Sequence, residues 1–179
     1  MSTTGPPAPE PVRRIITGHD AAGKAVVADD EPVAGYPFAG SRTLFTDLWW
    51  QDGFPARNDD SVADGVARHD KVIINPNGSA FRVVDTPPHT KSSPHIFHRT
   101  ISLDYGILIS GTLTLVLDDG KRVVMKPGDV VVQRGTIHAW VNETDEWARM
   151  YFVLLPSHKV KVGDKELDVE AKHLPGVSE

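Results

Sequence analysis

The sequence predicts an all-β protein, an antiparallel sandwich or barrel of short strands. From His98 to Asn142, runs of apolar, largely β-branched and aromatic residues are separated by Gly, Pro and Asp at intervals of roughly ten residues, which is typical of these folds. Asp118-Asp119-Gly120 predicts a hairpin turn, and Pro127-Gly128 marks another turn before Asp129. Strands of this length and spacing can close into a small barrel with a packed interior.

Length and composition restrict the class of protein. The chain has 179 residues, enough for one domain with extensions, and 40% hydrophobic and 24% charged residues indicate a soluble globular protein. A net charge of -5 argues against nonspecific binding to nucleic acid, and no apolar run approaches the ~20 residues of a membrane span. The absence of cysteine excludes disulfides and thiolate chemistry. The N-terminus lacks the parts of a signal peptide, so we expect a cytoplasmic protein.

The chain divides into four segments. Residues 1–11 contain five Pro or Gly and predict a disordered leader. Residues 12–91 predict N-terminal strands and a connector that pack on the barrel, including a strand that ends at Trp49 and Trp50. Residues 92–155 form the expected core, and residues 156–179 predict a C-terminal hairpin and tail with alternating charges.

Side-chain alternation separates two faces of the first core strands. If Asp104 faces the interior, a period of two also turns His98, Thr100 and Ser102 inward. The opposite face then carries only apolar residues: Ile101, Leu103, Tyr105, Ile107 and Ile109. Such a face requires a cover, which the N-terminal strands or a second subunit would supply, and we expect a homodimer.

The central stretch resembles the cupin superfamily of small jelly-roll barrels. His98 and Asp104, followed by Gly111, are similar to the first cupin motif. The run from Pro127 to Asn142, with Gly135 and His138, is similar to the second motif. The resemblance covers residues 92–155 and implies a cupin-type double-stranded β-helix with an N-terminal β extension. It leaves the activity open, because one fold hosts many functions.

The resemblance implies a reduced metal site. Where the family has the second histidine of its HxH pair, this chain has Thr100. The remaining set is His98, Asp104 and His138, a two-histidine, one-carboxylate arrangement that suits Fe(II) and leaves coordination positions open. The 3-hydroxyanthranilate dioxygenases provide a precedent, since their motif also lacks the second histidine. These ligand types do not separate iron(II), manganese, nickel and zinc.

Further residues are candidates for the substrate pocket. Thr100 and Trp140 share the predicted inward face, and His95 lies in a loop at the expected barrel mouth. Arg149, like Arg99, could pair with a substrate carboxylate through a bidentate contact, and Tyr151 shares the parity of Arg149. Each of these residues also has a plain structural interpretation as a packed or surface side chain.

Three classes of function remain open. A bound divalent metal would indicate a dioxygenase, a decarboxylase or a dehydratase or other lyase that acts on a small organic acid or carbonyl compound. Without a metal, His98 or His138 would act as a general base in an isomerase or dehydratase. A non-catalytic module that binds a small ligand is the third class, and the polar set would then be a relic of a metal site. No nucleic-acid or membrane partner is expected.

Overall fold

The computed structural model describes residues 5–38, 41–58, 64–69, 72–90 and 97–172, and the regular secondary structure of this part of the chain is almost entirely β-strand. Its strands, in chain order, are β1 (Val12–His19), β2 (Ala25–Val33), β3 (Tyr36–Pro37), β4 (Leu44–Asp52), β5 (Gly78–Thr86), β6 (Phe97–Arg99), β7 (Ser102–Ser110), β8 (Leu113–Val116), β9 (Arg122–Met125), β10 (Val130–Arg134), β11 (Ala139–Val141), β12 (Ala148–Pro156), β13 (Val160–Val162), β14 (Lys165–Leu167) and β15 (Glu170–Lys172). Two short 3-10 turns lie at Val66–Arg68 and Asp118–Gly120. The described residues contain no helix with the length and apolar character needed to cross a membrane.

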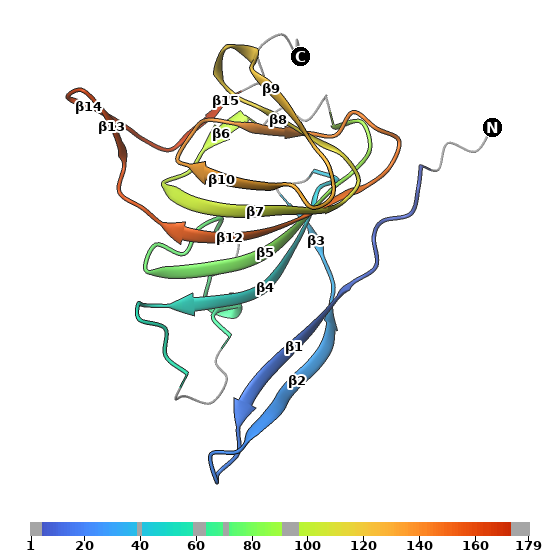
Figure 1. Ribbon diagram of the computed structural model, residues 1–179, viewed down its shortest axis with the longest axis vertical. Coiled ribbons are helices and arrows are strands. Elements are labelled where there is room, and N and C mark those ends of the chain that lie inside the picture. The colour runs from blue at the N-terminus through green and yellow to red at the C-terminus, as the bar shows by residue number, and fades with distance from the viewer. Residues whose placement is uncertain (1–4, 39–40, 59–63, 70–71, 91–96, 173–179) are drawn as a thin grey trace.

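Two antiparallel sheets form the body (Figure 1). The larger has the strand order β10-β7-β12-β5-β4-β3, and the smaller has the order β11-β8-β9. Strand β6 belongs to neither of them. It pairs with β15 and forms an additional bridge to His138. The all-β barrel predicted from the spacing of turn residues is therefore confirmed.

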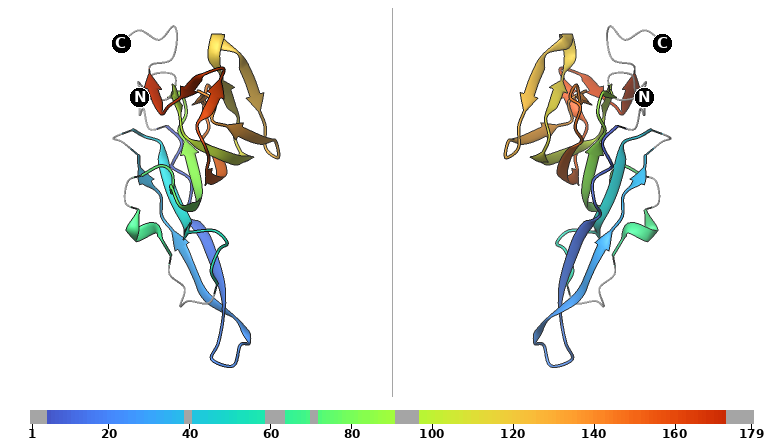
Figure 2. Two further views of the ribbon diagram at one scale, coloured as in Figure 1. Left: turned by 90° about the vertical axis from the view of Figure 1, so that its left-hand side faces the viewer. Right: turned by 90° about the vertical axis from the view of Figure 1, so that its right-hand side faces the viewer.

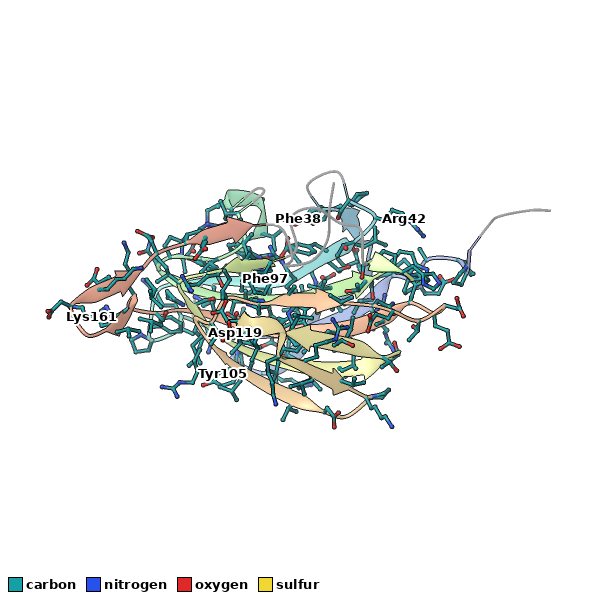
Figure 3. The ribbon with its side chains drawn as sticks, turned by 90° about the horizontal axis from the view of Figure 1, so that it is seen from above. Phe38, Arg42, Phe97, Tyr105, Asp119 and Lys161 are labelled. Atoms are coloured by element: carbon teal, nitrogen blue, oxygen red, sulfur yellow. The ribbon has the colours of Figure 1, made fainter. Side chains whose placement is uncertain are left out.

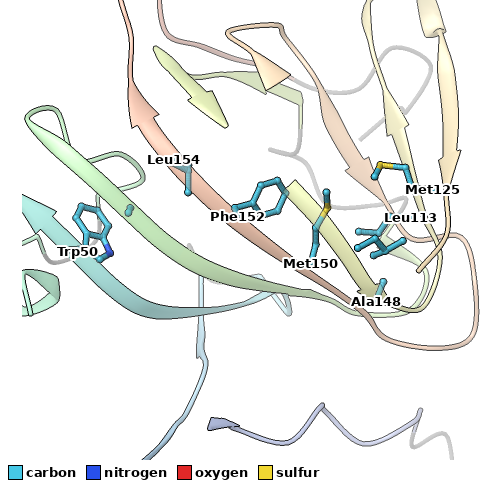
Figure 4. Packing of buried hydrophobic residues seen from close by; sticks show 9 residues of the cluster. Trp50, Leu113, Met125, Ala148, Met150, Phe152 and Leu154 are labelled. Atoms are coloured by element: carbon cyan, nitrogen blue, oxygen red, sulfur yellow. The ribbon is translucent and has the colours of Figure 1, made fainter. Parts of the chain in front are cut away.

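The main core lies between the two sheets (Figure 4). It is built from inward positions of six strands: Trp50, Ala80, Leu108, Leu113, Met125, Ala148, Met150, Phe152 and Leu154. Gly106 of β7 faces this core, and a Cβ there would lie 2.6 Å from Met150 Cε. A second apolar cluster packs on the other side of β11 and consists of Phe97, Val116, Ile137, Ala139 and Val141.

The period-two assignment of β7 agrees with the burial of its side chains. Ser102, Asp104 and Leu108 are buried, whereas Tyr105 and Ile107 on the alternate positions are exposed. Figure 3, which views the body from above, labels Tyr105 on β7 and Phe97 on β6. The outer face of β7 is thus largely uncovered by the chain's own N-terminal strands.

Strands β1 and β2 form a hairpin that projects from the body (Figure 2). Val12 at its base packs on the outer face of the large sheet with Leu48, Val83 and Tyr151, while the tip extends into solvent. Arg14 holds this base in place, because its guanidinium donates to the Leu48 carbonyl at 3.2 Å.

The segment before β1 contacts the body. The Trp147 indole donates to the Pro6 carbonyl at 3.1 Å, and Arg149 donates to the Glu10 carbonyl at 2.8 Å. The sequence predicted a leader without a structural role for residues 1–11. Of that leader the structure describes residues 5–11, and these two contacts connect it to β12 and the loop before it.

Candidate functional site

A row of polar side chains occupies the inward face at the start of β7. Thr100, Ser102 and Asp104 follow one another at alternate positions and are all buried. The hydroxyl oxygens of Thr100 and Ser102 lie 2.8 Å apart. Either hydroxyl can donate to the other. The row therefore places two hydroxyl groups and one carboxyl group on the same inward face.

Asp104 is the only acid in this row, and one of its oxygens has no partner. Oδ1 is buried and makes no hydrogen bond to any described residue. Burial raises the pKa of Asp104 to about 6, while the hydrogen bond from Ser102 acts in the opposite direction. The carboxyl group can therefore take up or release a proton close to neutral pH, with one oxygen available for a ligand.

Two histidines from separate segments lie beside each other in the same interior. His98 in β6 and His138 before β11 exchange backbone hydrogen bonds of 2.8 and 2.9 Å. Their ring centroids are 4.4 Å apart with an interplanar angle of 52°. The backbone bridge thus fixes the relative position of the first and second sequence motifs.

His138 is held as a neutral imidazole. Its Nδ1 lies 3.0 Å from the Thr136 carbonyl oxygen, which requires a proton on that nitrogen. Nε2 then carries the lone pair and accepts from the Gln133 amide nitrogen at 2.7 Å. The same amide nitrogen lies 2.7 Å from Nδ1, which is already a donor. Burial, followed by repulsion from His98, lowers the pKa of His138 to about 3.

Gln133 contacts the imidazole and is the cross-strand neighbour of Asp104. It lies directly opposite Asp104 in the pairing of β10 with β7, and its side chain is buried. Its Oε1 makes no hydrogen bond to the described residues, so two unpartnered acceptors lie on neighbouring strands. Gln133 was not predicted from the sequence. The available signal was a polar residue directly after the valine run from Val130 to Val132, five positions before His138.

The described residues, as they are placed, do not fit a three-ligand metal centre. No group of three His, Cys, Asp or Glu side chains among them has the proximity to hold a metal ion. The Nε2 lone pair of His138 is occupied by Gln133, and the Thr100 hydroxyl is paired with Ser102. The unpartnered Asp104 Oδ1 is the feature that a cation would satisfy. The metal centre of His98, Asp104 and His138 remains a prediction.

The polar side chains described above form one polar group of the interior: His98, Thr100, Ser102, Asp104, Gln133 and His138. Of the predicted pocket residues, two belong to this polar group or lie beside it. Thr100 belongs to the hydroxyl row, and the Trp140 ring lies 6.1 Å from the His138 ring and 5.9 Å from Phe152. An aromatic wall therefore borders the imidazole. His95 falls outside the described residues.

The structure does not bring Arg149 or Tyr151 to the site. Arg149 donates to both carboxylate oxygens of Asp85, at 2.7 and 2.9 Å, and Tyr151 packs against Phe81 and Val83 on the outer face of the large sheet. The interior positions of β12 belong to Met150 and Phe152. Since the two side chains lie on the outward parity of this strand, their prediction as pocket residues is corrected.

Arg99 also has a structural partner. Its guanidinium pairs with Glu170 of β15 at 3.1 Å and donates to the Asp168 carbonyl at 3.4 Å. Both arginines that were predicted as possible partners of a substrate carboxylate thus form ion pairs with acidic residues of this chain. The polar group of the interior consists of neutral donors and one acid.

A groove of about 400 Å³ lies away from this polar group. It is lined by one residue of β8, most of β9 and the turn into β10: Leu115, Val123, Val124, Met125, Gly128, Asp129, Val130 and Val131. None of the predicted site residues borders it. We place the candidate site at the polar group, since the groove carries only one ionisable side chain, that of Asp129.

Comparison with known proteins identifies one family. The model of the family described as "Cupin domain" matches residues 82–154. A phomopsin biosynthesis cluster protein D from Diaporthe leptostromiformis is 35% identical over 171 residues, covering 92% of this chain and 85% of that protein. The cupin-domain-containing oxidoreductase fogC from Aspergillus ruber is 33% identical, with 88% and 78% covered. The oxidoreductase srdB from Neurospora crassa is 33% identical, with 97% and 91% covered.

Solved structures of the same family are also similar to this chain. A cupin 2 conserved barrel domain protein from Salinispora arenicola is 28% identical with a TM-score of 0.37, covering 46% of this chain and 66% of that one. The Cnp3 cupin domain from Schizosaccharomyces pombe is 12% identical with a TM-score of 0.48, covering 81% and 88%.

Proposed function

The chain belongs to the cupin family, and we propose on this basis that it is an enzyme that transfers protons on a small carbonyl compound inside the barrel. Relatives described as cupin-domain-containing oxidoreductases support an enzyme, and a relative described as a biosynthesis cluster protein supports a small organic substrate. Asp104 acts first as the general base and then as the general acid. His138 stays neutral and is hydrogen-bonded to Gln133 and to the Thr136 carbonyl oxygen.

The observation that carries this proposal is the buried, unpartnered Oδ1 of Asp104. A general base must offer a free oxygen to the proton that it removes, and its pKa should lie near the working pH. The pKa of about 6 that burial gives Asp104 meets the second condition. Because Arg99 and Arg149 are paired with Glu170 and Asp85, a carbonyl compound suits the described interior better than an organic acid.

An internal oxidation and reduction is the reaction class that fits best. In an α-hydroxy carbonyl compound, the Asp104 carboxylate removes the proton from the carbon that carries the hydroxyl group, which forms an enediolate. The protonated carboxyl group, whose proton exchanges with solvent, then donates a proton to either carbon of the enediolate; donation to the former carbonyl carbon, with the hydroxyl proton moving to the former carbonyl oxygen, completes the isomerisation. The hydroxyl carbon is oxidised and the carbonyl carbon is reduced, so no external electron acceptor is needed.

A metal-dependent oxygenase or lyase is the second candidate. The buried, unpartnered Asp104 Oδ1, which a cation would satisfy, favours it. His98, Asp104 and His138 would be the ligands after Gln133 leaves His138 Nε2. Elemental analysis of the purified protein, after exposure to Fe(II), Mn(II), Ni(II) and Zn(II), separates the two candidates. Stoichiometric metal that is lost in His138→Ala would support the second.

Deuterium exchange tests the proton-transfer proposal. Wild-type protein is incubated in D₂O with glycolaldehyde and with 2-hydroxyacetophenone, and proton NMR follows the carbon that carries the hydroxyl group. We expect incorporation with at least one of the two compounds, and a loss of about 100-fold or more in Asp104→Asn. Asp145→Asn is the matched control, because this carboxyl side chain is 94% exposed at the surface. Equal rates in wild type and Asp104→Asn, or no incorporation by wild type, would refute the proposal.

A further inference from the structure

Two buried acceptor atoms belong to side chains that are direct neighbours across two strands. Gln133 of β10 pairs with Asp104 of β7, and each residue is 4% exposed. Directly opposite side chains of an antiparallel pair lie on the same face of the sheet, with Cβ atoms about 5 Å apart. Gln133 Oε1 and Asp104 Oδ1 make no hydrogen bond to any residue that the structure describes. One small group of a ligand can therefore contact both side chains.

A chain of hydrogen bonds fixes the orientation of the Gln133 amide. The Thr136 carbonyl oxygen lies 3.0 Å from His138 Nδ1, so this nitrogen carries the proton and Nε2 keeps its lone pair. The amide nitrogen of Gln133 lies 2.7 Å from Nε2 and donates to it. The amide thus turns its NH₂ group toward the imidazole, which leaves Oε1 to accept from a bound molecule. Gln133 offers this molecule an acceptor and not a donor.

The neighbours of Asp104 on the side away from Gln133 are apolar. Leu154 of β12 pairs with Asp104, and Ala80 of β5 pairs with Leu154. Trp50 of β4 continues this row, and the three residues are between 0% and 7% exposed. Of the two cross-strand neighbours of Asp104, only the side chain of Gln133 can accept a hydrogen bond from a hydroxyl group.

The arginine nearest to this row is already bound within the chain. Arg82 of β5 lies two positions beyond Ala80 and is 2% exposed. Its Nε donates to Asp47 at 2.7 Å, and its terminal nitrogens donate to the Val72 and Ile73 carbonyls, each at 3.2 Å. These contacts hold the guanidinium toward β4 and the segment before β5. A donor for Gln133 Oε1 has to come from a ligand that enters the interior.

We propose that Gln133 selects the substrate by its hydroxyl group: Oε1 accepts a hydrogen bond from the α-hydroxyl, beside the carboxylate that removes the proton from the same carbon. The inference rests on the proposed function and adds to it the residue that determines specificity. Gln133 gains and loses no proton. Because the hydroxyl oxygen and the reacting hydrogen are bound to one carbon atom, holding the first places the second next to Asp104.

A ligand without this hydroxyl group should bind more weakly. A ketone that lacks it leaves Oε1 buried and unpaired, and an ether oxygen in its place would bring two acceptors together. Sites that hydrogen-bond a substrate hydroxyl reject analogues without one for this reason. The proposal therefore predicts a preference that depends on the donor and not on the presence of an oxygen atom.

Dissociation constants for a matched set of aryl ketones test this preference. The compound 2-hydroxyacetophenone carries the hydroxyl group, acetophenone lacks it, and 2-methoxyacetophenone keeps the oxygen without the donor. By ligand-observed NMR titration, we expect wild type to bind the first compound about tenfold more tightly than either of the others. Gln133→Met has a side chain of similar length without an oxygen, and its preference should fall to about twofold or less.

The ratio of dissociation constants isolates the contact with the hydroxyl group. The hydrogen bond to His138 that Gln133→Met also loses affects all the ketones alike, so it cancels in the ratio. Gln51→Met is the matched control, because Gln51 is the other glutamine of the chain and its amide donates to the Asp52 carbonyl at 3.1 Å. This variant should keep the wild-type preference. If circular dichroism shows that Gln133→Met does not fold, Gln133→Leu replaces it.

Wild type that binds the ketones equally, or binds none of them, overturns the assignment, as does a folded Gln133 variant that keeps the wild-type preference. The titration measures binding and not turnover, so it is separate from the deuterium exchange that tests the reaction. Exchange without a preference for the hydroxyl group would leave the proton transfer in place and remove the role of Gln133. A preference that is lost in Gln133→Met, without exchange, would support the role of Gln133 in binding and refute the proton transfer.

Discussion

At the scale of single residues, two ionisable groups of one interior respond to pH in opposite directions. Burial raises the pKa of Asp104 from 3.8 to about 6, so the folded state binds this proton more tightly than the unfolded state. Burial lowers the pKa of His138 from 6.5 to about 3, so the folded state binds that proton less tightly. The contribution of Asp104 to stability is therefore lost as the pH rises from about 4 to 6, and that of His138 is lost as the pH falls from 6.5 to 3.

These opposing effects overlap between about pH 4 and pH 6 and partly cancel in wild type. We predict that single variants separate them. In Asp104→Asn the free energy of unfolding should increase with pH across this window, and in His138→Asn it should decrease. Each slope is at most about 1.4 kcal/mol per pH unit for one group. Denaturant unfolding at a series of pH values measures both, and slopes of the same sign in the two variants would contradict the assignment.

Sequence pattern predicted the position of some site residues and missed others for a definite reason. The inward direction of Thr100, Ser102 and Asp104 follows from strand periodicity, which is local information. The role of Gln133 depends on the register of β10 against β7, which the sequence of one strand does not contain. Arg149 was predicted to bind a substrate carboxylate, but it forms an ion pair with Asp85 on the neighbouring strand β5. Residue roles that depend on cross-strand neighbours were therefore the ones missed or misassigned.

At the scale of elements, the turn between β7 and β8 depends on Gly111. Its φ is +75°, and a Cβ there would lie 2.5 Å from the Trp147 carbonyl oxygen. Gly23, in the β1–β2 turn, has a similar φ of +76°, but a Cβ added there would have no atom within 4 Å, so it provides the matched control. We predict that Gly23→Ala costs about 1 kcal/mol of strain and Gly111→Ala about 2–4 kcal/mol. Denaturant unfolding measures the difference, and equal costs would show that the loop before β12 yields to the new methyl group.

The segment before β1 gives a second prediction at this scale. Pro6 and Glu10 accept hydrogen bonds from Trp147 and Arg149, so removing residues 1–10 should lower the free energy of unfolding by about 1–2 kcal/mol. Removing residues 1–5 keeps both acceptors and should have little effect. Thermal unfolding of the two truncated proteins compares them directly. If the longer deletion is also silent, these contacts add nothing to stability, as the sequence had predicted for the leader.

In the C-terminal segment, the local sequence pattern is sufficient to predict the hairpin but not the strand that follows it. The polar hairpin around Gly163 is present as β13 and β14, because a turn signal between short alternating runs is local. The sequence predicted a tail after the hairpin and no further strand, yet Glu170–Lys172 form β15 and pair with β6. This pairing joins residues about 70 positions apart, and Arg99 and Glu170 reinforce it with an ion pair. No short-range signal indicates such a contact.

At the scale of the whole molecule, the homodimer expected from the sequence can be tested by changing the solvent. An interface formed by the exposed outer face of β7, with Tyr105, Ile107 and Ile109, should weaken on cooling, because the hydrophobic contribution falls with temperature. We predict that the dissociation constant rises roughly two- to fivefold between about 25 and 5 °C. A change from about 50 to 500 mM NaCl should alter it less than twofold, since few charges take part. Analytical ultracentrifugation provides both values, and strong dependence on salt would point to a charged interface instead.

The pairing of β6 with β15 also has a consequence for synthesis on the ribosome. His98 lies on a strand whose sheet partner, β15, is the last strand described, and the bridge to His138 is its other support. A nascent chain that has released residues up to β12 can close both main sheets, but it still lacks the strand that pairs with β6. The strand that carries His98 would then gain its sheet partner only when β15 has left the exit tunnel. Until that moment the two main sheets can be in place while β6 is supported by its bridge to His138.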